Sequence, residues 1–212
     1  MNQGKKYNAL IVDLDGTLYF QNPVRLRMAI SILIFCITHP LKWQEVFLVR
    51  DYRILYSNGV KHLERCSLLA QKYHLHTNHV EDIINKWMIE RPIPFVRKFR
   101  DKRLISLLEN CQAQGVKLFV YSDYPVADKM EALGFMPDAA YSADEVGCLK
   151  PSPDGLLRIL KENEVKASDC LFIGDKFDKD GKCAENTGMD YYILPQSRIR
   201  RGKFYKVNRL LS

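Results

Sequence analysis

The sequence predicts an α/β fold in which a parallel β-sheet is covered by helices on both faces. Short apolar runs alternate with segments of helical periodicity, and the runs are too continuously apolar for a half-exposed antiparallel sheet. Polar residues gather where several of these runs end. The chain has 212 residues, 47% of them hydrophobic, which suffices for one packed domain with a sizeable insertion.

Five short apolar runs are the expected strands, and the third is the weakest of them. They comprise residues 8–12, 116–121, 139–142, 170–173 and 191–194. Helices are expected between these runs, the clearest over 99–114, where leucines recur at helical spacing before Gly115. Strands and helices that alternate in this way favour a parallel sheet.

Residues 21–96 break the alternation, because they contain helix-length periodic runs and no convincing strand. We therefore expect residues 1–20 and 97–212 to form the core and residues 21–96 to form an all-helical insertion. The segment 91–94 contains two prolines and is expected to be the linker back to the core, since proline disrupts a helix interior. The apolar stretch 28–38 covers about half of the roughly 20 residues that cross a bilayer. We expect a buried helix there, with an interfacial patch as the alternative.

Charge and cysteine content limit the class of partner and the compartment. The net charge of +7 favours anionic partners, namely phosphorylated metabolites, acidic membranes or nucleic acid. None of the six cysteines forms a C-x-x-C pair or lies at zinc-finger spacing from a histidine. We expect reduced, mostly buried thiols in a cytoplasmic protein, and the apolar run before Asp13 is too short for a signal peptide.

Two further groups invite a functional interpretation, and the simpler structural one is preferred for both. His74, His76 and His79 lack supporting ligands at suitable spacing, so a polar turn between helices is expected instead of a metal site. The tail is rich in basic residues and is expected to be a solvated terminus, with nucleic-acid or membrane contact as alternatives. Its members are Arg198, Arg200, Arg201, Lys203 and Lys206, interleaved with Phe204 and Tyr205.

Five polar residues are predicted to meet at one edge of the sheet. Asp13 and Asp15 follow the first apolar run, Ser122 follows the second, Asp175 follows the fourth, and Lys150 precedes a helix. The carboxyl ends of parallel strands line the binding crevice of such a fold. Clustered carboxylates need a cation, and an all-oxygen ligand set favours Mg²⁺. A carboxylate can attack phosphorus, a second can transfer the proton, and lysine and serine can hold the phosphate.

These motifs resemble the four signatures of the haloacid dehalogenase-like (HAD) hydrolase superfamily, in the same order. They are DLDGTL at 13–18, Ser122 after its strand, KPSPDG at 150–155, and Gly174-Asp175 with further acids downstream. The resemblance covers residues 5–20 and about 97–195. It implies a Rossmann-like core, and the insertion fits the helical cap of phosphoglycolate phosphatase-like and phosphoglucomutase-like members.

The resemblance also implies roles for individual residues. Asp13 would be the nucleophile and a Mg²⁺ ligand, Asp15 the general acid/base with its carbonyl on the metal, and Asp175 the third protein ligand. Leu14 and Gly16 would offer backbone amides to the phosphate. Ser122, the amide of Asp123 and Lys150 would complete the phosphate site, with the Asp123 side chain turned away or paired. Asp178 or Asp180 would support the site, and the sequence does not rank them.

The function implied is that of a Mg²⁺-dependent phosphatase acting on a small phosphorylated metabolite through an aspartyl-phosphate on Asp13. Asp15 favours phosphoryl transfer over dehalogenation. A phosphomutase on the same fold is the first alternative. A non-catalytic or membrane-peripheral binding protein that retains the site is the second, and no nucleic-acid partner is expected.

Overall fold

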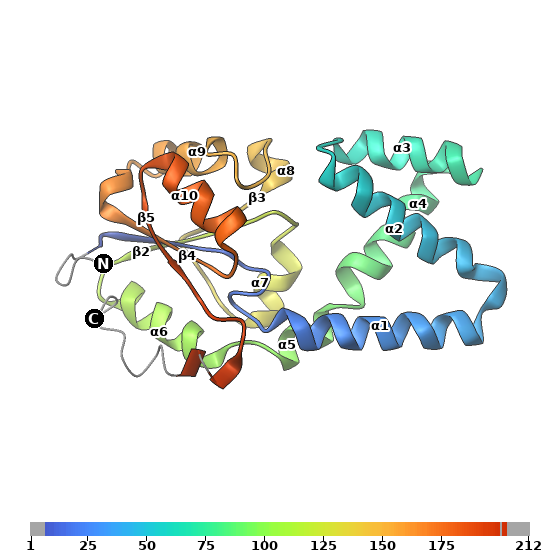
Figure 1. The fold of residues 1–212 in the computed structure, drawn as a ribbon, viewed down its shortest axis with the longest axis horizontal. Coiled ribbons are helices and arrows are strands. Elements are labelled where there is room, and N and C mark those ends of the chain that lie inside the picture. The colour runs from blue at the N-terminus through green and yellow to red at the C-terminus, as the bar shows by residue number, and fades with distance from the viewer. Residues whose placement is uncertain (1–6, 200, 203–212) are drawn as a thin grey trace. The chain divides into compact units, whose positions relative to one another are not determined.

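The computed structural model describes residues 7–199, 201 and 202. The chain forms two compact units, one comprising Met1–Gln21 with Phe99–Ser212 and the other Asn22–Lys98. The first contains the sheet and is called the sheet unit below, and the second is called the helical unit (Figure 1).

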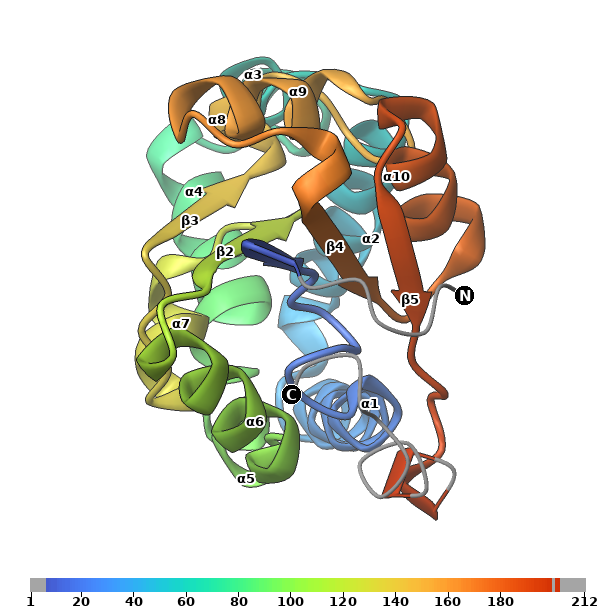
Figure 2. The same cartoon turned by 90° about the vertical axis from the view of Figure 1, so that its left-hand side faces the viewer.

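The sheet unit is built on a five-stranded, wholly parallel sheet with the order β3-β2-β1-β4-β5 (Figure 2). This architecture confirms the predicted α/β fold class. The strands are β1 Ala9–Val12, β2 Lys117–Ser122, β3 Ala139–Ser142, β4 Cys170–Gly174 and β5 Asp190–Ile193.

The register of the central strands brings three strand ends together. Val12 of β1 pairs with Val120 of β2 on one side and with Ile173 of β4 on the other. The backbone N–H of Asp13 continues the ladder by donating to the Ile173 carbonyl at 2.8 Å. Residues that directly follow β1, β2 and β4 therefore lie at one edge of the sheet.

Helices cover both faces of this sheet (Figure 1). Helices α9 (Asp154–Glu162) and α10 (Lys182–Thr187) pack on the face that carries Ile11, Phe119 and Phe172. Helix α6 (Lys102–Ala113) lies on the opposite face, and the Asp101 side chain caps its N-terminus. The remaining elements are α7 Ala127–Leu133, α8 Ala143–Val146, a 3₁₀ turn at Ala167–Asp169 and a π-helical turn at Phe177–Gly181.

The helical unit has its own apolar core, to which Phe35, Leu48, Leu69, Ile83 and Trp87 contribute. Its elements are α1 Gln21–Thr38, a 3₁₀ turn Pro40–Lys42, α2 Trp43–Ser57, α3 His62–Tyr73, α4 Thr77–Ile84, a π-helical segment Asn85–Glu90 and α5 Ile93–Lys98. His74 ends α3 in the left-handed conformation and His76 precedes α4, so the predicted polar turn between helices is confirmed for these two residues. It is wrong for His79, which lies inside α4.

The predicted linker at 91–94 is wrong at its second half, because Pro94 lies in the first turn of α5. The N–H groups of a first helical turn have no partner within the helix, so a proline there removes no hydrogen bond. Only Arg91 and Pro92 form the turn that precedes the helix.

The stretch 28–38 is helical, as predicted, but the expectation that this helix is buried is wrong. Only Val24 and Phe35 of α1 are buried, whereas Leu33 and Ile37 are 61% and 71% exposed. The segment is apolar on all sides, but only one face of the helix contacts the core of the unit. Its other apolar side chains therefore remain exposed. Within the described residues, no single helix has the length and apolar character to span a bilayer. The pair Gln21–Thr38 and Pro40–Ser57 passes by length and composition together, with a bend of 118° between the two helices.

The expectation of a solvated basic tail is wrong for Arg201, which is fully buried. Its guanidinium donates to the carbonyls of Gly16 and Thr17 at 2.7 and 2.6 Å and pairs with Asp101 at 3.2 Å. Arg198 is exposed, with its guanidinium over the Phe20 ring. The other predicted members of the tail (Arg200, Lys203, Phe204, Tyr205 and Lys206) lie outside the described residues.

Candidate active site

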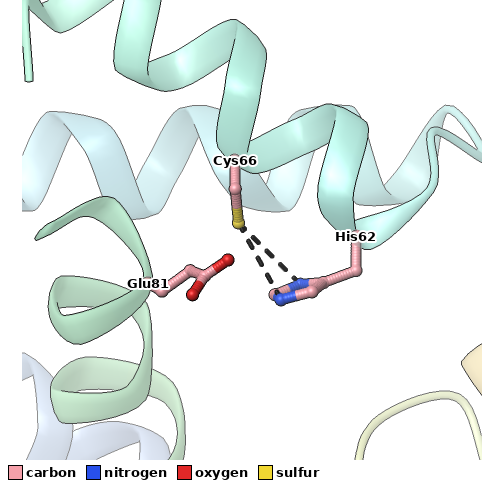
Figure 3. A group of neighbouring side chains, drawn as sticks. All are labelled: His62, Cys66 and Glu81. Carbon is pink, nitrogen blue, oxygen red and sulfur yellow. Dashed lines mark hydrogen bonds between the residues drawn. The ribbon is translucent and has the colours of Figure 1, made fainter. Parts of the chain in front are cut away.

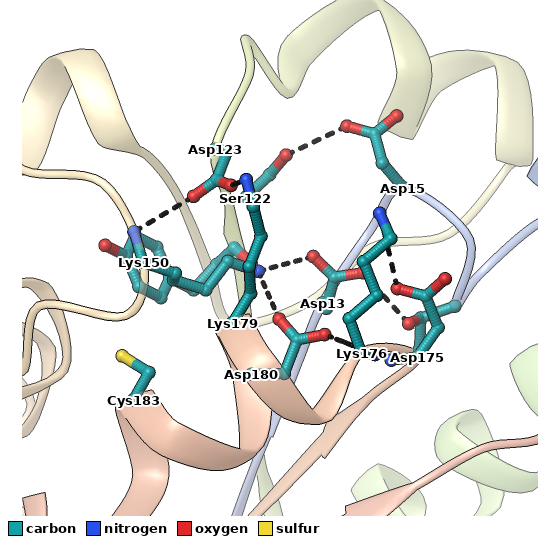
Figure 4. A network of polar contacts seen from close by, with 12 residues as sticks. Asp13, Asp15, Ser122, Asp123, Lys150, Asp175, Lys176, Lys179, Asp180 and Cys183 are labelled. Carbon is teal, nitrogen blue, oxygen red and sulfur yellow. Dashed lines mark hydrogen bonds and ion pairs between the residues drawn. The ribbon is translucent and has the colours of Figure 1, made fainter. Parts of the chain in front are cut away.

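Asp13 lies at the centre of a buried polar cluster at the carboxyl edge of the sheet (Figure 4). It directly follows β1, the middle strand, so residues from β2 and β4 flank it. Lys150 donates to its Oδ1 at 2.5 Å, and the Thr17 hydroxyl donates to its Oδ2 at 2.9 Å. One carboxylate thus meets an ammonium and a hydroxyl, each of which helps to orient it.

Lys150 connects Asp13 to a second carboxylate, that of Asp180. Its ammonium donates to Asp180 Oδ1 at 2.7 Å, and the lysine is itself buried. Asp180 Oδ2 accepts from the backbone N–H groups of Asp175 and Lys176 at 3.1 and 3.0 Å. The Asp180 side chain lies so close to the backbone of Gly174 that a Cβ at position 174 would collide with it. Glycine at 174 therefore lets the turn after β4 fold back over this carboxylate.

The two acids that the sequence left unranked differ sharply. Asp180 is buried within the cluster, whereas Asp178 is exposed and pairs with Lys182 at 2.9 Å on the surface. The π-helical turn Phe177–Gly181 separates them by two residues and so turns their side chains in different directions. Asp180 is the acid that supports Lys150.

Asp175 completes a group of three buried carboxylates with Asp13 and Asp180. Each offers an oxygen within 4.8 Å of the others. A Cβ on Gly16 would collide with the Asp175 carboxylate, so a side chain at 16 would exclude it from this position. Lys150 is the cation that bonds two members of the group, and Lys176 lies 4.0 Å from Asp175. A buried excess of negative charge with oxygen donors is the chemistry that Mg²⁺ fits.

The electrostatics of the cluster agree with that fit. Burial raises the pKa of Asp13, and the neighbouring Asp180 and Asp175 raise it further against the opposing effect of Lys150. Burial also raises the pKa of Asp175. Burial alone would lower the pKa of Lys150, but attraction to Asp13 and Asp180 outweighs it and raises that pKa well above its usual value. The lysine is therefore a permanent cation, and a divalent ion would favour the ionised carboxylates.

Asp15 points into a separate set of donors. Lys129 from α7 pairs with its carboxylate at 2.6 and 2.9 Å, Ser122 donates to Oδ2 at 3.2 Å, and the Tyr19 hydroxyl donates to Oδ1. Burial would raise the pKa of Asp15, but the charge and hydrogen bond of Lys129 outweigh it and lower that pKa. Asp15 is thus held as a carboxylate next to Ser122.

The other predicted phosphate-binding residues either neighbour Asp15 in the chain, as Leu14 and Gly16 do, or lie at the end of β2, as Ser122 and Asp123 do. Ser122 ends β2, and its hydroxyl also accepts from the Tyr124 N–H at 3.1 Å. The Asp123 side chain is paired, as predicted, because it accepts from the Lys150 N–H at 3.1 Å and from Lys179 Nζ at 2.6 Å. Leu14 is buried, and Gly16 takes φ +103°, a left-handed value that only glycine adopts readily.

Sequence reasoning missed the residues that support the site from outside the motifs. Lys129 lies in the first turn of α7, Tyr19 follows the first motif, and Gln196 donates to Asp175 Oδ2 at 3.2 Å. Tyr19 could have been noticed as a hydroxyl four residues from Asp15. Lys129 and Gln196 have no local pattern that distinguishes them from surface residues.

Comparison with known proteins identifies the family of this chain. A family model described as a haloacid dehalogenase-like hydrolase matches residues 7–188. A search of the curated proteins finds no match. Among solved structures, a 2-haloacid dehalogenase from Pseudomonas syringae pv. Tomato DC3000 is 17% identical, with a TM-score of 0.66 over 89% of this chain and 86% of that one.

Two further solved structures contain ligands. YfnB from Bacillus subtilis, bound to magnesium, is 18% identical with a TM-score of 0.59, over 90% of this chain and 89% of that one. A mutant of CbbY from Rhodobacter sphaeroides, in complex with xylulose-(1,5)bisphosphate, is 18% identical with a TM-score of 0.58, over 91% and 89%. At these identities the likeness concerns the fold.

Proposed function

Since this chain belongs to the haloacid dehalogenase-like hydrolases, we propose that it is a Mg²⁺-dependent phosphatase that forms an aspartyl-phosphate on Asp13. The observation that carries the proposal is the buried contact of Asp13 with Lys150, backed by Asp180, beside a second acid at Asp15. A nucleophilic carboxylate needs a fixed orientation and a nearby cation to approach an anionic phosphate.

In the first step, a carboxylate oxygen of Asp13 forms a bond to phosphorus while the bond from phosphorus to the ester oxygen breaks. Asp15 must first take up a proton from solvent, and it then gives this proton to the leaving oxygen, so that the product departs as an alcohol. In the second step Asp15 takes a proton from water, whose oxygen attacks the phosphorus and releases phosphate from Asp13. The donors around Asp15 suit the second step, because they stabilise its ionised form.

Asp13 and Asp175 would hold the magnesium ion, with Asp180 behind them and the backbone carbonyl of Asp15 as a further ligand. The ion would offset the negative charge that gathers when a phosphate enters a group of carboxylates. Lys150 balances part of the same charge through its contact with Asp13. Ser122 and the amides of Leu14, Gly16 and Asp123 are the proposed donors to the phosphate oxygens.

Asp15 and its surroundings favour phosphoryl transfer over dehalogenation, which needs no acid to protonate a departing alcohol. The side chains of Tyr19, Ser122 and Lys129 hold this carboxylate in place, which is an arrangement suited to proton transfer. The structural relatives include both a dehalogenase and a protein bound to a sugar bisphosphate, so the fold leaves this choice to the site. A phosphomutase would need the same acid and stays an alternative.

The decisive test compares the native chain with Asp13→Asn, which removes the nucleophile and leaves a residue of similar size. We expect phosphate release from p-nitrophenyl phosphate and from a panel of phosphorylated metabolites to require both Mg²⁺ and Asp13. A parallel assay measures chloride release from 2-chloropropionate. Chloride release without phosphate release would overturn the proposal in favour of a dehalogenase, and isomerised product with little free phosphate would favour a mutase.

The helical unit is the proposed cap that selects the substrate, because it is inserted directly after the first motif.

A second role, attachment to a membrane surface, is favoured by the exposed apolar side chains of α1, such as Leu33 and Ile37. Sedimentation with anionic vesicles at low salt tests it. A native chain that stays in the supernatant contradicts membrane attachment.

A further inference from the structure

Three side chains of the helical unit converge on one point (Figure 3). His62 and Cys66 lie one turn apart on α3, and Glu81 faces them from α4. One donor atom from each lies within 4.8 Å of the others. Residues four apart on a helix share a face, which is why the histidine and the cysteine reach the same point.

The spacing of the donors is close to that of a bound zinc ion. Zinc bonds of about 2.3 Å to sulfur and about 2.0–2.1 Å to nitrogen, at a tetrahedral angle, place the two donors roughly 3.6 Å apart. The Cys66 Sγ lies 3.9 Å from His62 Nε2. A movement of a few tenths of an ångström would bring the two donors to the distance that zinc requires.

The hydrogen bonds of His62 favour the same arrangement. Its Nδ1 lies 2.7 Å from the Tyr52 hydroxyl, and the Cys66 Sγ lies 4.0 Å from Nδ1 and 3.9 Å from Nε2. Because the tyrosine hydroxyl occupies Nδ1, Nε2 is the ring nitrogen left for a metal. A histidine that binds a metal commonly uses one ring nitrogen as ligand and hydrogen-bonds through the other. Arg65 Nη2 donates to the Tyr52 hydroxyl at 3.0 Å, so the tyrosine is itself fixed in place.

The donor types select the ion. A thiolate, an imidazole and a carboxylate form a mixed sulfur, nitrogen and oxygen set, which suits Zn²⁺ and does not suit Mg²⁺. Ionised Cys66 and Glu81 together carry the two negative charges that neutralise a divalent cation. His62 retains contact with solvent, so water can supply the fourth ligand.

We propose that His62, Cys66 and Glu81 bind a Zn²⁺ ion that joins α3 to α4, with a water molecule as the fourth ligand. The ion would link two helices whose contact otherwise depends on apolar packing around Leu69 and Val80. This role is structural and is independent of the chemistry proposed for Asp13.

Binding would replace the Cys66 proton by the metal. Burial raises the pKa of the Cys66 thiol to about 11, with Glu81 adding to the effect and Arg65 opposing it. The thiol of the metal-free protein is therefore protonated at neutral pH, and one proton must leave as the Zn²⁺–sulfur bond forms.

Cobalt and zinc titrations of the tag-free, chelator-treated chain in excess Mg²⁺ test the proposal. The excess Mg²⁺ competes with zinc for the carboxylates of the sheet unit, and the thiolate band distinguishes metal bound at Cys66 from any metal bound there. We expect one equivalent of Zn²⁺ to stay bound after gel filtration. We expect Co²⁺ to give tetrahedral visible bands and a near-ultraviolet thiolate-to-metal band, and Zn²⁺ to release one proton per equivalent in weak buffer.

Matched variants assign these signals. Cys66→Ser should lose the thiolate band and the retained zinc, whereas Cys36→Ser, which changes another thiol of the same unit, should keep both. Tyr52→Phe should weaken zinc about 10–100-fold, as expected when a bond to a ligating histidine is lost. His62 lies at the solvent side of the cluster. The substitution His62→Ala removes a second proposed ligand there, so it gives another test if Cys66→Ser fails to fold. Absence of the thiolate band in the native chain, or its persistence in Cys66→Ser, would overturn the zinc site.

Discussion

At the scale of single residues, the site depends on which of two neighbouring acids faces the cluster. Asp180 pairs with Lys150 at 2.7 Å and accepts two backbone hydrogen bonds, while Asp178 pairs with Lys182 at the surface. Asp180→Asn should lower turnover by at least about 100-fold, because Lys150 loses the partner that positions it against Asp13. Asp178→Asn changes turnover less than about twofold, since an exposed ion pair contributes little.

Steady-state kinetics on the best substrate of the phosphate panel measures both variants, and circular dichroism checks that both fold. The two substitutions remove the same charge from the same turn, so each serves as the control for the other. Equal losses of activity would contradict the assignment of Asp180 as the supporting acid.

The residue scale also shows how far sequence reasoning reaches. Asp13, Lys150 and Asp175 could be placed together because Asp13 and Asp175 follow neighbouring parallel strands and Lys150 lies in the connection that leads from β3 to β4. Lys129 could not, because its contact with Asp15 spans 114 residues and depends on the direction in which α7 leaves the sheet. A single lysine in a short amphipathic helix has no local feature that separates it from a solvated one.

At the scale of elements, Asp51 joins α2 to α3. It accepts from Lys72 at 2.6 Å and from the Tyr73 hydroxyl at 2.7 Å, and Arg50 adds a bond at 2.9 Å. Burial would raise the pKa of Asp51, but these bonds outweigh it and lower the pKa to about 2. A lowered pKa means that the carboxylate stabilises the folded state above its unfolded pKa of about 4.

Asp51→Asn should therefore lower the free energy of unfolding of the helical unit by about 1–3 kcal/mol at pH 7. The difference from the native chain should shrink as the pH falls from about 4 towards 2, where the native carboxyl also becomes protonated. Urea unfolding followed by tryptophan fluorescence measures it, because Trp43 and Trp87 both lie in this unit. A difference that stays constant down to pH 2 would contradict a role for the charge.

Elements were predicted well where periodicity met a stop signal, as in α6, and poorly where only composition was available. The apolar stretch within α1 indicated burial, but a helix that is apolar all round does not reveal which face packs. Pro94 indicated a linker because proline disrupts the interior of a helix, although it is tolerated in the first turn. The sequence alone did not show that α5 begins at Ile93, which places Pro94 in that first turn.

At the scale of the whole chain, Arg201 ties the C-terminal segment to the loop that carries the first motif. Its donations to Gly16 and Thr17 span 185 and 184 residues, and its ion pair with Asp101 joins the N-terminus of α6 to the same point. Nothing local in the basic tail distinguishes Arg201 from its neighbours, so its burial could not be predicted. The Gly16 and Thr17 carbonyls belong to the two residues that directly follow Asp15.

Arg201→Met should destabilise the sheet unit by about 3–5 kcal/mol, because it removes a buried cation that pairs with Asp101 and donates to three carbonyls, those of Gly16, Thr17 and Pro195. Urea unfolding followed by circular dichroism measures this loss, and Arg198→Met is the control, with an expected change below about 1 kcal/mol for an exposed arginine. Adding Asp101→Asn to Arg201→Met should cost less than the sum of the two single changes, since the ion pair is already lost. Strictly additive losses would contradict a coupled anchor and leave Arg201 as a packing residue alone.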